Sequence, residues 1–288
     1  MGILLALTSS ALFGTADFLG GLLSRRLPAL LVAVWSQLAG AIALLIVALA
    51  SGQAFSGGGA AWGMLSGVFG GLGLLVFYRA LAIGTMSIVA PVSAAGATLP
   101  VAVSLARGDV PGPVVLTGLA VTFLGIVLAS RQAVEPAAGG LRHPPTATGL
   151  ALLAAACFGA FFLFLDEGGN AAGDGRLLWV VIGARAGSLP TLLAVVVGVW
   201  LSGRAGVLIR PARLLGAVAV TGLFDTSANV FFTFATTHGN LGVVAVLGSL
   251  YPVMTVILAR IVLAERLARV QATGVALALA GVVLVSAG

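Results

Sequence analysis

The sequence predicts an all-α integral membrane protein of about ten transmembrane helices, arranged as two inverted repeats of five helices each. Three observations support this prediction. The composition is too apolar for a water-soluble surface, loop-forming residues divide the chain into ten apolar segments, and the two halves of the chain resemble each other.

The composition indicates that lipid is the main solvent of this chain. Hydrophobic residues make up 60% of the 288 residues and charged residues only 8%. A soluble domain usually carries about 25% charged residues. So few charged side chains cannot cover a water-exposed surface, and we therefore expect a multi-pass protein in the lipid bilayer.

Ten apolar segments are each close to the roughly 20 residues that a bilayer-spanning helix needs. They are residues 2–23, 29–50, 60–82, 86–106, 112–130, 148–166, 177–201, 214–237, 241–263 and 269–287. The breaks between them are rich in Gly, Pro and charged residues, which favour loops. These breaks read SRRLP, SGQAFSGGG, RGDVPGP, RQAVEPAAGGLRHPP, DEGGNAAGDGR, SGRAGVLIRPAR, HGN and AERLAR.

An internal repeat relates the two halves. The segment GLAVTFLGIVLAS (118–130) aligns without gaps on GVALALAGVVLVS (274–286), and LFG (12–14) corresponds to CFG (157–159). We therefore divide the chain into a first repeat over 1–130, a central loop over 131–147 and a second repeat over 148–288. Because each repeat has an odd number of spans, the two must lie in opposite orientations, as in many transporters.

Arginines concentrate in alternate loops, and this pattern predicts the orientation. They follow the first, fifth, seventh and ninth spans, and Arg79 lies on the same side. The arginines in these loops are Arg25, Arg26, Arg131, Arg142, Arg204, Arg210, Arg213, Arg266 and Arg269. By the positive-inside rule these loops are cytoplasmic. We expect a bacterial cytoplasmic (inner) membrane protein with both termini outside.

The end of the chain resembles a known family. The segment GVVAVLGSLYPVMTVILARIVLAERLARVQATGVALALAGVVLVS (242–286) is similar to the end of EamA-type members of the drug/metabolite transporter superfamily. The first half repeats it more loosely, with RGD (107–109) where the second half has AER (264–266). The resemblance implies a ten-helix bundle with a central cavity that works by alternating access. It also implies transport of small solutes, commonly amino acids or other metabolites and often outward.

A polar stripe on the eighth span predicts a functional cavity. Thr221, Asp225, Asn229, Thr233 and Thr237 recur every four residues, so they share one helix face. Polar side chains on a membrane helix face protein or a water-filled cavity. Asp225 is therefore expected to contact a substrate ammonium group or to exchange a proton. Alternatively, it is the structural partner of a buried arginine.

Other charged and aromatic side chains inside the spans are further candidates. Arg185 can bind a substrate carboxylate through two hydrogen bonds, or it can neutralise Asp225 or Asp17. Asp17 on the first span can bind protons or cations, or it can extend toward the nearer membrane surface. Gln37 and Tyr251 can line the cavity, although residues of these types are more often packing or interface residues.

Four prolines within the predicted spans are expected to kink their helices, because proline removes a backbone hydrogen bond. They are Pro91, Pro100, Pro190 and Pro252. Tyr78 and Arg79 lie near the end of the third span. We expect these two residues to anchor that span at the membrane interface.

Several functional classes find no support in the sequence. The chain contains no lysine and therefore no GxxxxGK[ST] phosphate loop. His143, His238 and Cys157 are far apart in the sequence, so we expect no metal site and no cofactor. There is no GxSxG motif of a serine hydrolase, and no basic run that would indicate nucleic acid. We do not expect an enzyme.

The remaining prediction is a secondary transporter that exports or exchanges small polar metabolites, such as amino acids, by alternating access. The alternative is proton-coupled efflux of hydrophobic cationic drugs, with Asp17 or Asp225 as the exchange site. The expected partners are a small-molecule solute and the lipid bilayer, and the chain is expected to be a monomer or a homodimer.

Overall fold

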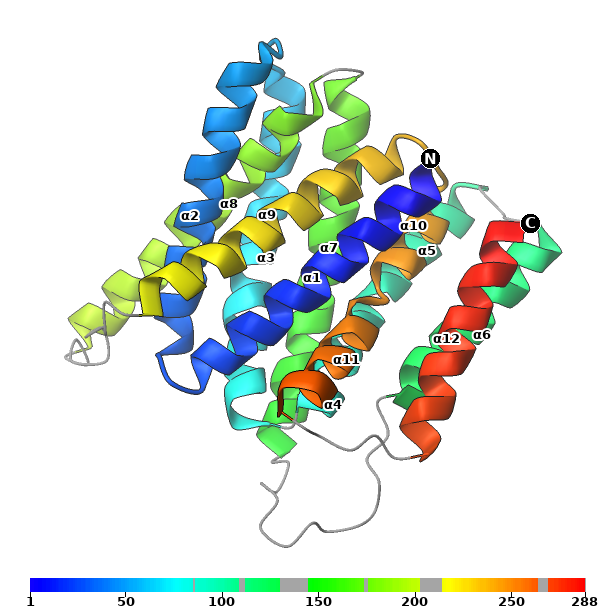
Figure 1. The fold of residues 1–288 in the computed structure, drawn as a ribbon. Coiled ribbons are helices and arrows are strands. Elements are labelled where there is room, and N and C mark those ends of the chain that lie inside the picture. The colour runs from blue at the N-terminus through cyan, green and yellow to red at the C-terminus, as the bar shows by residue number, and fades with distance from the viewer. Residues whose placement is uncertain are drawn as a thin grey trace, which may run out of the picture.

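The computed structural model is a bundle of α-helices (Figure 1). It describes residues 1–84, 86–108, 112–129, 145–173, 176–202, 214–263 and 269–287. The first half contains α1 (Gly2–Ser24), α2 (Ala29–Ser51), α3 (Gly57–Ile83), α4 (Met86–Ala94), the 3-10 turn η1 (Ala95–Ala97), α5 (Thr98–Ala106) and α6 (Pro113–Ala129). The second half contains α7 (Pro145–Ala172), α8 (Leu177–Leu201), α9 (Leu215–Thr236), α10 (Leu241–Gly248), α11 (Tyr251–Leu263) and α12 (Arg269–Ala287).

The helices confirm the predicted fold class, an all-α membrane protein in two halves. Among the described residues, seven segments are long and apolar enough to cross a membrane. They are α1, α2, α3, α7, α8, α9 and the stretch Leu241–Ala259, which contains α10 and the larger part of α11. The predicted spans at 86–106, 112–130 and 269–287 correspond to α4 to α5, α6 and α12.

The sixth predicted span is longer than expected, and the break predicted after residue 166 is wrong. Helix α7 continues to Ala172, so Asp166 and Glu167 lie inside it. Both carboxylates have partners nearby. Arg107 at the end of α5 forms ion pairs with both, and Asn170 donates to Asp166 Oδ2 from one turn later at 3.4 Å. Most of the predicted central loop lies outside the described residues, as do Glu265 and the arginines predicted in the loops after the fifth and seventh spans.

The fourth span of each half is broken near its middle. In the first half, η1 separates α4 from α5, and in the second half Ser249 and Leu250 separate α10 from α11. Pro100 and Pro252 lie in the first turns of α5 and α11, where a missing backbone N–H removes no intrahelical bond. Pro91 lies within α4, and Pro190 lies inside the uninterrupted α8.

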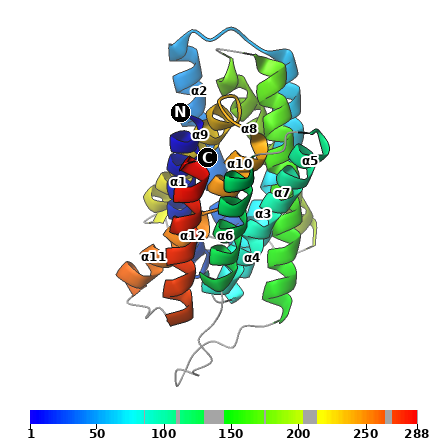
Figure 2. The ribbon, with the colours of Figure 1, turned by 90° about the vertical axis from the view of Figure 1, so that its right-hand side faces the viewer.

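Helices of each half pack against helices of the other half. Helix α3 lies against α7 and α8 of the second half, while α9 lies against α1 and α2 of the first (Figure 1). Each interface carries a hydrogen bond from a serine to a backbone carbonyl: Ser66 of α3 donates to the carbonyl of Phe161, and Ser9 of α1 donates to the carbonyl of Ala228, each at 2.8 Å. Helices α6 and α12, the last of each half, pair side by side (Figure 2). Both termini lie at the same end of the bundle (Figure 1).

Glycines allow the backbones of the two halves to touch. A side chain at Gly63 or Gly67 of α3 would overlap backbone atoms of α8. Gly183 and Gly187 of α8 meet the backbone of α3 in the same way. Small residues four positions apart permit this close approach between membrane helices, where lipid provides no hydrophobic driving force. The α3–α8 interface therefore depends on the absence of side chains.

The LFG and CFG segments of the repeat have equivalent structural roles. Gly14 of α1 packs against the backbone of Tyr251, directly after the break in the second half. Gly159 of α7 packs against the backbone of Gly96, inside the break in the first half. Each half therefore uses the glycine of this segment to hold the broken span of the other half.

The interfacial position expected for Tyr78 is wrong. The side chain is fully buried, and its phenol ring lies over Gly20 of α1. Gly20 leaves space for the ring because it has no side chain. The sequence of the third span contains no information about this space, because Gly20 belongs to the first span. Arg79, the next residue, is exposed.

We expect the substitution Gly67→Ala to destabilise the protein by about 1–3 kcal/mol, because the added methyl group would overlap the carbonyl oxygen of Ala184. Thermal unfolding of the purified protein in detergent measures this change. The matched control is Gly198→Ala in α8, where the added carbon meets no atom within 4 Å. The control should melt at or slightly above the wild-type temperature, since alanine favours helix. Equal melting temperatures for Gly67→Ala and wild type would contradict the packing described above.

Candidate functional site

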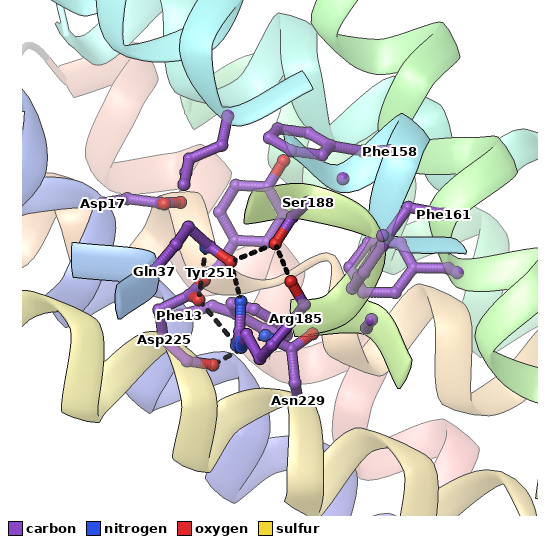
Figure 3. A pocket seen from close by; sticks show the side chains of 15 residues that line it. Phe13, Asp17, Gln37, Phe158, Phe161, Arg185, Ser188, Asp225, Asn229 and Tyr251 are labelled. Carbon is purple, nitrogen blue, oxygen red and sulfur yellow. Dashed lines mark hydrogen bonds and ion pairs between the residues drawn. The ribbon is translucent and has the colours of Figure 1, made fainter. Parts of the chain in front are cut away.

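A central cavity lies between the two halves of the bundle (Figure 3). Its walls come from α1, α2 and α3 of the first half and from α7, α8, α9 and α11 of the second. Its volume is about 40 Å³, which is room for a few water molecules. The cavity walls therefore leave little free space between them in this conformation, and a larger solute requires the walls to move apart.

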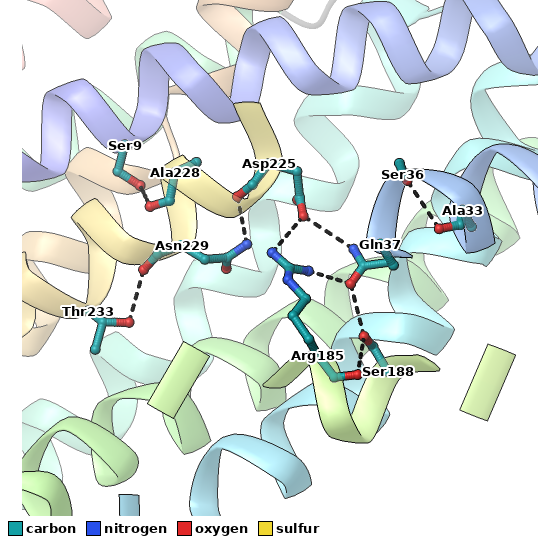
Figure 4. Close-up of polar contacts among 10 residues, drawn as sticks. All are labelled: Ser9, Ala33, Ser36, Gln37, Arg185, Ser188, Asp225, Ala228, Asn229 and Thr233. Carbon is teal, nitrogen blue, oxygen red and sulfur yellow. Dashed lines mark hydrogen bonds and ion pairs between the residues drawn. The ribbon is translucent and has the colours of Figure 1, made fainter. Parts of the chain in front are cut away.

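Three helices meet in the cavity wall through a buried ion pair (Figure 4). Arg185 Nη2 of α8 lies 2.9 Å from Asp225 Oδ2 of α9, and these side chains are only 7% and 13% exposed. Gln37 of α2 connects to both: its Oε1 accepts from Arg185 Nη1, and its Nε2 donates to Asp225 Oδ2 at 3.2 Å. Ser188, one turn after Arg185, also donates to Gln37 Oε1, at 2.9 Å. The structure thus brings together Arg185 and Asp225, which the sequence offered as partners.

Small residues place the ion pair by bringing α2 and α9 into backbone contact. A side chain on Gly222 would overlap the carbonyl of Ser36, and one on Gly40 would overlap the hydroxyl of Thr226. Gln37 and Asp225 lie within one turn of these contacts. The distance between the amide and the carboxylate is therefore set by glycines rather than by the polar groups themselves.

The polar stripe on α9 divides into cavity residues and structural residues. Asp225 and Asn229 line the cavity, and Thr221 and Thr233 do not. The hydroxyls of Thr221 and Thr233 donate to backbone carbonyls four residues earlier, each at 2.9 Å. Asn229 Nδ2 donates to the carbonyl of Asp225 at 2.8 Å, while its Oδ1 has no hydrogen-bond partner among the described residues. Asn229 Oδ1 is thus a buried acceptor whose hydrogen-bonding capacity the described residues leave unused.

Asp17 of α1 lines the same cavity and is only 8% exposed. The carboxylate of Asp17 makes no hydrogen bond or ion pair with any residue that the structure describes. Arg185, the arginine in the cavity wall, is already held by Asp225 and Gln37. An ionised carboxylate in apolar surroundings costs several kcal/mol unless it is paired. The described residues therefore offer an ionised Asp17 no counter-charge.

Aromatic rings form much of the remaining wall. They are Phe13, Phe158, Phe161, Phe162 and Tyr251. The ring of Phe13 packs edge-on against Phe162 at 5.8 Å and against Tyr251 at 6.5 Å between centroids. The hydroxyl of Tyr251 shares a hydrogen bond of 3.0 Å with Ser93, which links the broken spans of the two halves. The cavity is thus largely apolar, with its charges on one side (Figure 3).

Several of these wall residues are not among those that the sequence marks. The three phenylalanines of α7 and Ser188 were not candidates, although two signals could have identified some of them. Phe13 and Phe158 occupy the same place in the LFG and CFG segments, and Ser188 follows Arg185 by three residues on the same helix face. Pro100, Pro190 and Pro252 are not in the cavity wall, and the side chain of Pro91 lies outside the described part of the chain.

The described residues contain no group of three His, Cys, Asp or Glu side chains that could hold a metal ion. Asp17 and Asp225 line the cavity without a third ligand of these types. Within this part of the chain, the chemistry of the cavity is that of binding by charge, amide and aromatic groups.

Comparisons with known proteins agree with this architecture. The model of the EamA-like transporter family matches residues 1–131 and 145–287. No curated protein matches the sequence. A crystal structure of a protein with 18% sequence identity superposes with a TM-score of 0.66 and covers 99% of this chain and 96% of its own. At this identity the likeness shows a common fold.

We expect the ion pair to act as a unit in stability measurements. Arg185→Leu alone should destabilise the protein by about 3–5 kcal/mol, because it leaves Asp225 buried without its partner. The double variant Arg185→Leu with Asp225→Leu should recover much of this loss, since both charges are removed. Thermal unfolding of the two single variants and the double variant measures the coupling. Additive effects would show that the pair does not hold together in the membrane protein.

Proposed function

Because the chain belongs to the EamA-like transporter family, we propose that it is a secondary transporter that exports or exchanges small polar metabolites, such as amino acids, by alternating access. Family membership makes it a membrane transporter rather than an enzyme, with a small-molecule solute and the membrane as its partners. The finer assignment of solute and mechanism rests on the central cavity.

The observation that carries the proposal is the ion pair of Arg185 and Asp225 in the cavity wall, bridged by Gln37. An amino acid offers one carboxylate and one ammonium group. The guanidinium of Arg185 matches a carboxylate through two parallel hydrogen bonds, and Asp225 matches the ammonium. Gln37 can donate to a carboxylate and accept from an ammonium. When the pair opens, the carboxylate of a zwitterion therefore replaces Asp225 as the partner of Arg185, and its ammonium replaces Arg185 as the partner of Asp225.

Charge balance also disfavours opening of the cavity wall when no solute is bound. Separating Arg185 from Asp225 without a solute would leave two uncompensated charges in a buried wall, at a cost of about 3–5 kcal/mol. A bound zwitterion removes this cost. The opened wall is thus populated mainly when solute is present, which is the requirement for exchange of one solute for another.

The repeated halves supply the movement. The cavity of about 40 Å³ must widen to admit an amino acid, and its walls belong to both halves. The breaks in the fourth spans, at η1 and between α10 and α11, are positions where the backbone can change direction without breaking a helix ladder. Rocking of one half against the other would open the cavity to each side in turn.

A second candidate is proton-coupled efflux of hydrophobic cations, which the surroundings of Asp17 favour. Asp17 has no partner among the described residues and lies in a wall rich in aromatic rings. Rings attract organic cations through their negative faces. In this mechanism a cation would displace a proton from Asp17, and Arg185 would keep its bond to Asp225.

The orientation and assembly are part of the proposal. We place the chain in a bacterial cytoplasmic membrane with both termini outside, on the basis of the basic loops. We also propose that it is a monomer or a homodimer. In a Cys157→Ser background, a cysteine introduced at the exposed Ala54, in the loop between α2 and α3 on the same side as the N-terminus, tests the orientation with a membrane-impermeant thiol reagent in intact cells. Labelling in intact cells supports the orientation, and labelling only after the membrane is permeabilised contradicts it.

Counterflow in proteoliposomes tests the transported solute. Liposomes preloaded with unlabelled amino acids should accumulate labelled amino acids in the wild type. Arg185→Ala and Asp225→Asn should each lower the rate about tenfold or more, since either change removes at least one charged contact worth about 1.4 kcal/mol. Arg269→Ala, an exposed arginine outside the cavity wall, is the control and should transport normally.

Two results would redirect the assignment. Amino-acid counterflow that survives in Arg185→Ala would refute the zwitterion mechanism. Uptake of a hydrophobic cationic dye that needs both Asp17 and a pH gradient, but not Arg185, would establish the second candidate instead.

A further inference from the structure

We propose that a groove between α2, α3, α7 and α8 binds an anionic phospholipid, with an acyl chain along its apolar walls and the phosphate on Arg79. This lipid site is separate from the central cavity, and it does not depend on the transported solute.

The groove is large and almost entirely apolar. Its volume is about 510 Å³, against about 40 Å³ for the central cavity, and it falls within the range of about 300–1,000 Å³ typical of ligand sites. Leu75 and Val76 of α3, with Val195 and Val199 of α8, are among its lining residues. Apart from Arg79, its lining consists of proline, alanine, leucine and valine. Such walls suit a hydrocarbon chain and offer a polar solute no hydrogen bond.

Arg79 is the charged group of this groove. It is exposed, it lies one turn before the end of α3, and it makes no ion pair or hydrogen bond with any described residue. The four acidic residues that the structure describes are Asp17, Asp166, Glu167 and Asp225, and none of them lines the groove. The groove therefore presents a positive charge that has no counter-ion among the described residues.

A second feature adds positive charge at the same place. Arg25 and Arg26 are exposed in the turn between α1 and α2, and this turn leads into Pro28, which is itself part of the groove wall. The arginines thus stand where α1 and α3 end and α2 begins, a position that suits the headgroup level of a bilayer. Clustered basic residues at this level attract anionic lipids.

The chemistry selects among possible occupants. The planar guanidinium of Arg79 matches a phosphate through paired hydrogen bonds. In a zwitterionic lipid the phosphate is already balanced by the headgroup amine, so its attraction to arginine is weaker. A second copy of this chain in the groove would bury Arg79 without a counter-ion, which is unfavourable. An anionic phospholipid satisfies both the apolar walls and the charge.

Native mass spectrometry of the delipidated, detergent-solubilised protein tests this proposal. Phosphatidylglycerol and phosphatidylcholine with the same acyl chains are titrated in parallel. We expect tighter binding of phosphatidylglycerol, and Arg79→Gln should weaken it about fivefold, the effect of one arginine at an anionic surface. Arg269→Gln, an exposed arginine outside the groove, should bind like the wild type. Val199→Trp, which fills the groove, should weaken both lipids.

The proposal is overturned by equal affinity for the two lipids, or by unchanged phosphatidylglycerol binding in Arg79→Gln. It is also overturned if Val199→Trp changes the oligomeric state of the protein but leaves lipid binding intact, because the groove would then be a contact between chains. Thermal unfolding of the variants without lipid confirms that each is folded.

Discussion

The buried ion pair between Arg185 and Asp225 is the interaction on which the central cavity depends. It joins α8 to α9, and Gln37 connects both residues to α2, so three helices from two halves converge on one set of charges. In a soluble protein such a pair is often replaceable by apolar residues. In a membrane helix, an intramembrane charge is costly and is usually found where a solute or ion passes, which supports the role proposed for this pair. In the proposed mechanism, the pair closes the empty cavity and opens to a zwitterion.

The charges are held in place by contacts that are not polar. Glycines on α3 and α8, and on α2 and α9, allow these helices to touch through their backbones. The same principle holds the broken fourth spans, where Gly14 and Gly159 lie against the breaks of the opposite halves. Close backbone packing sets distances more rigidly than long side chains can. The cavity therefore has a stiff frame with interruptions at two equivalent positions, which suits rocking of one half against the other.

Two sites of different chemistry follow from one arrangement of helices. The central cavity is small, carries two carboxylates and one guanidinium, and lies between the halves. The groove beside Arg79 is larger, apolar and has a single positive charge. A solute that needs charge balance suits the first site, and an amphipathic anion suits the second. If lipid in the groove stabilises α3 and α8, it also stiffens the helix that carries Arg185.

The sequence by itself determined that the chain lies in lipid, that its fold is all-helical and that its two halves are related by a repeat. Its apolar composition, ten segments and internal repeat required an all-helical membrane protein, and its isolated charges marked Asp225, Arg185 and Asp17 as candidates. These features are local or periodic, so they can be read along the chain. Only the tertiary structure decided which charges pair. It paired Arg185 with Asp225, left Asp17 without a partner among the described residues, and buried Tyr78 over Gly20. It also continued α7 past Asp166 and placed Arg107 from the other half 3.8 Å from that carboxylate. These outcomes depend on groups that are distant in sequence and close in space, and helix periodicity carries no information about them.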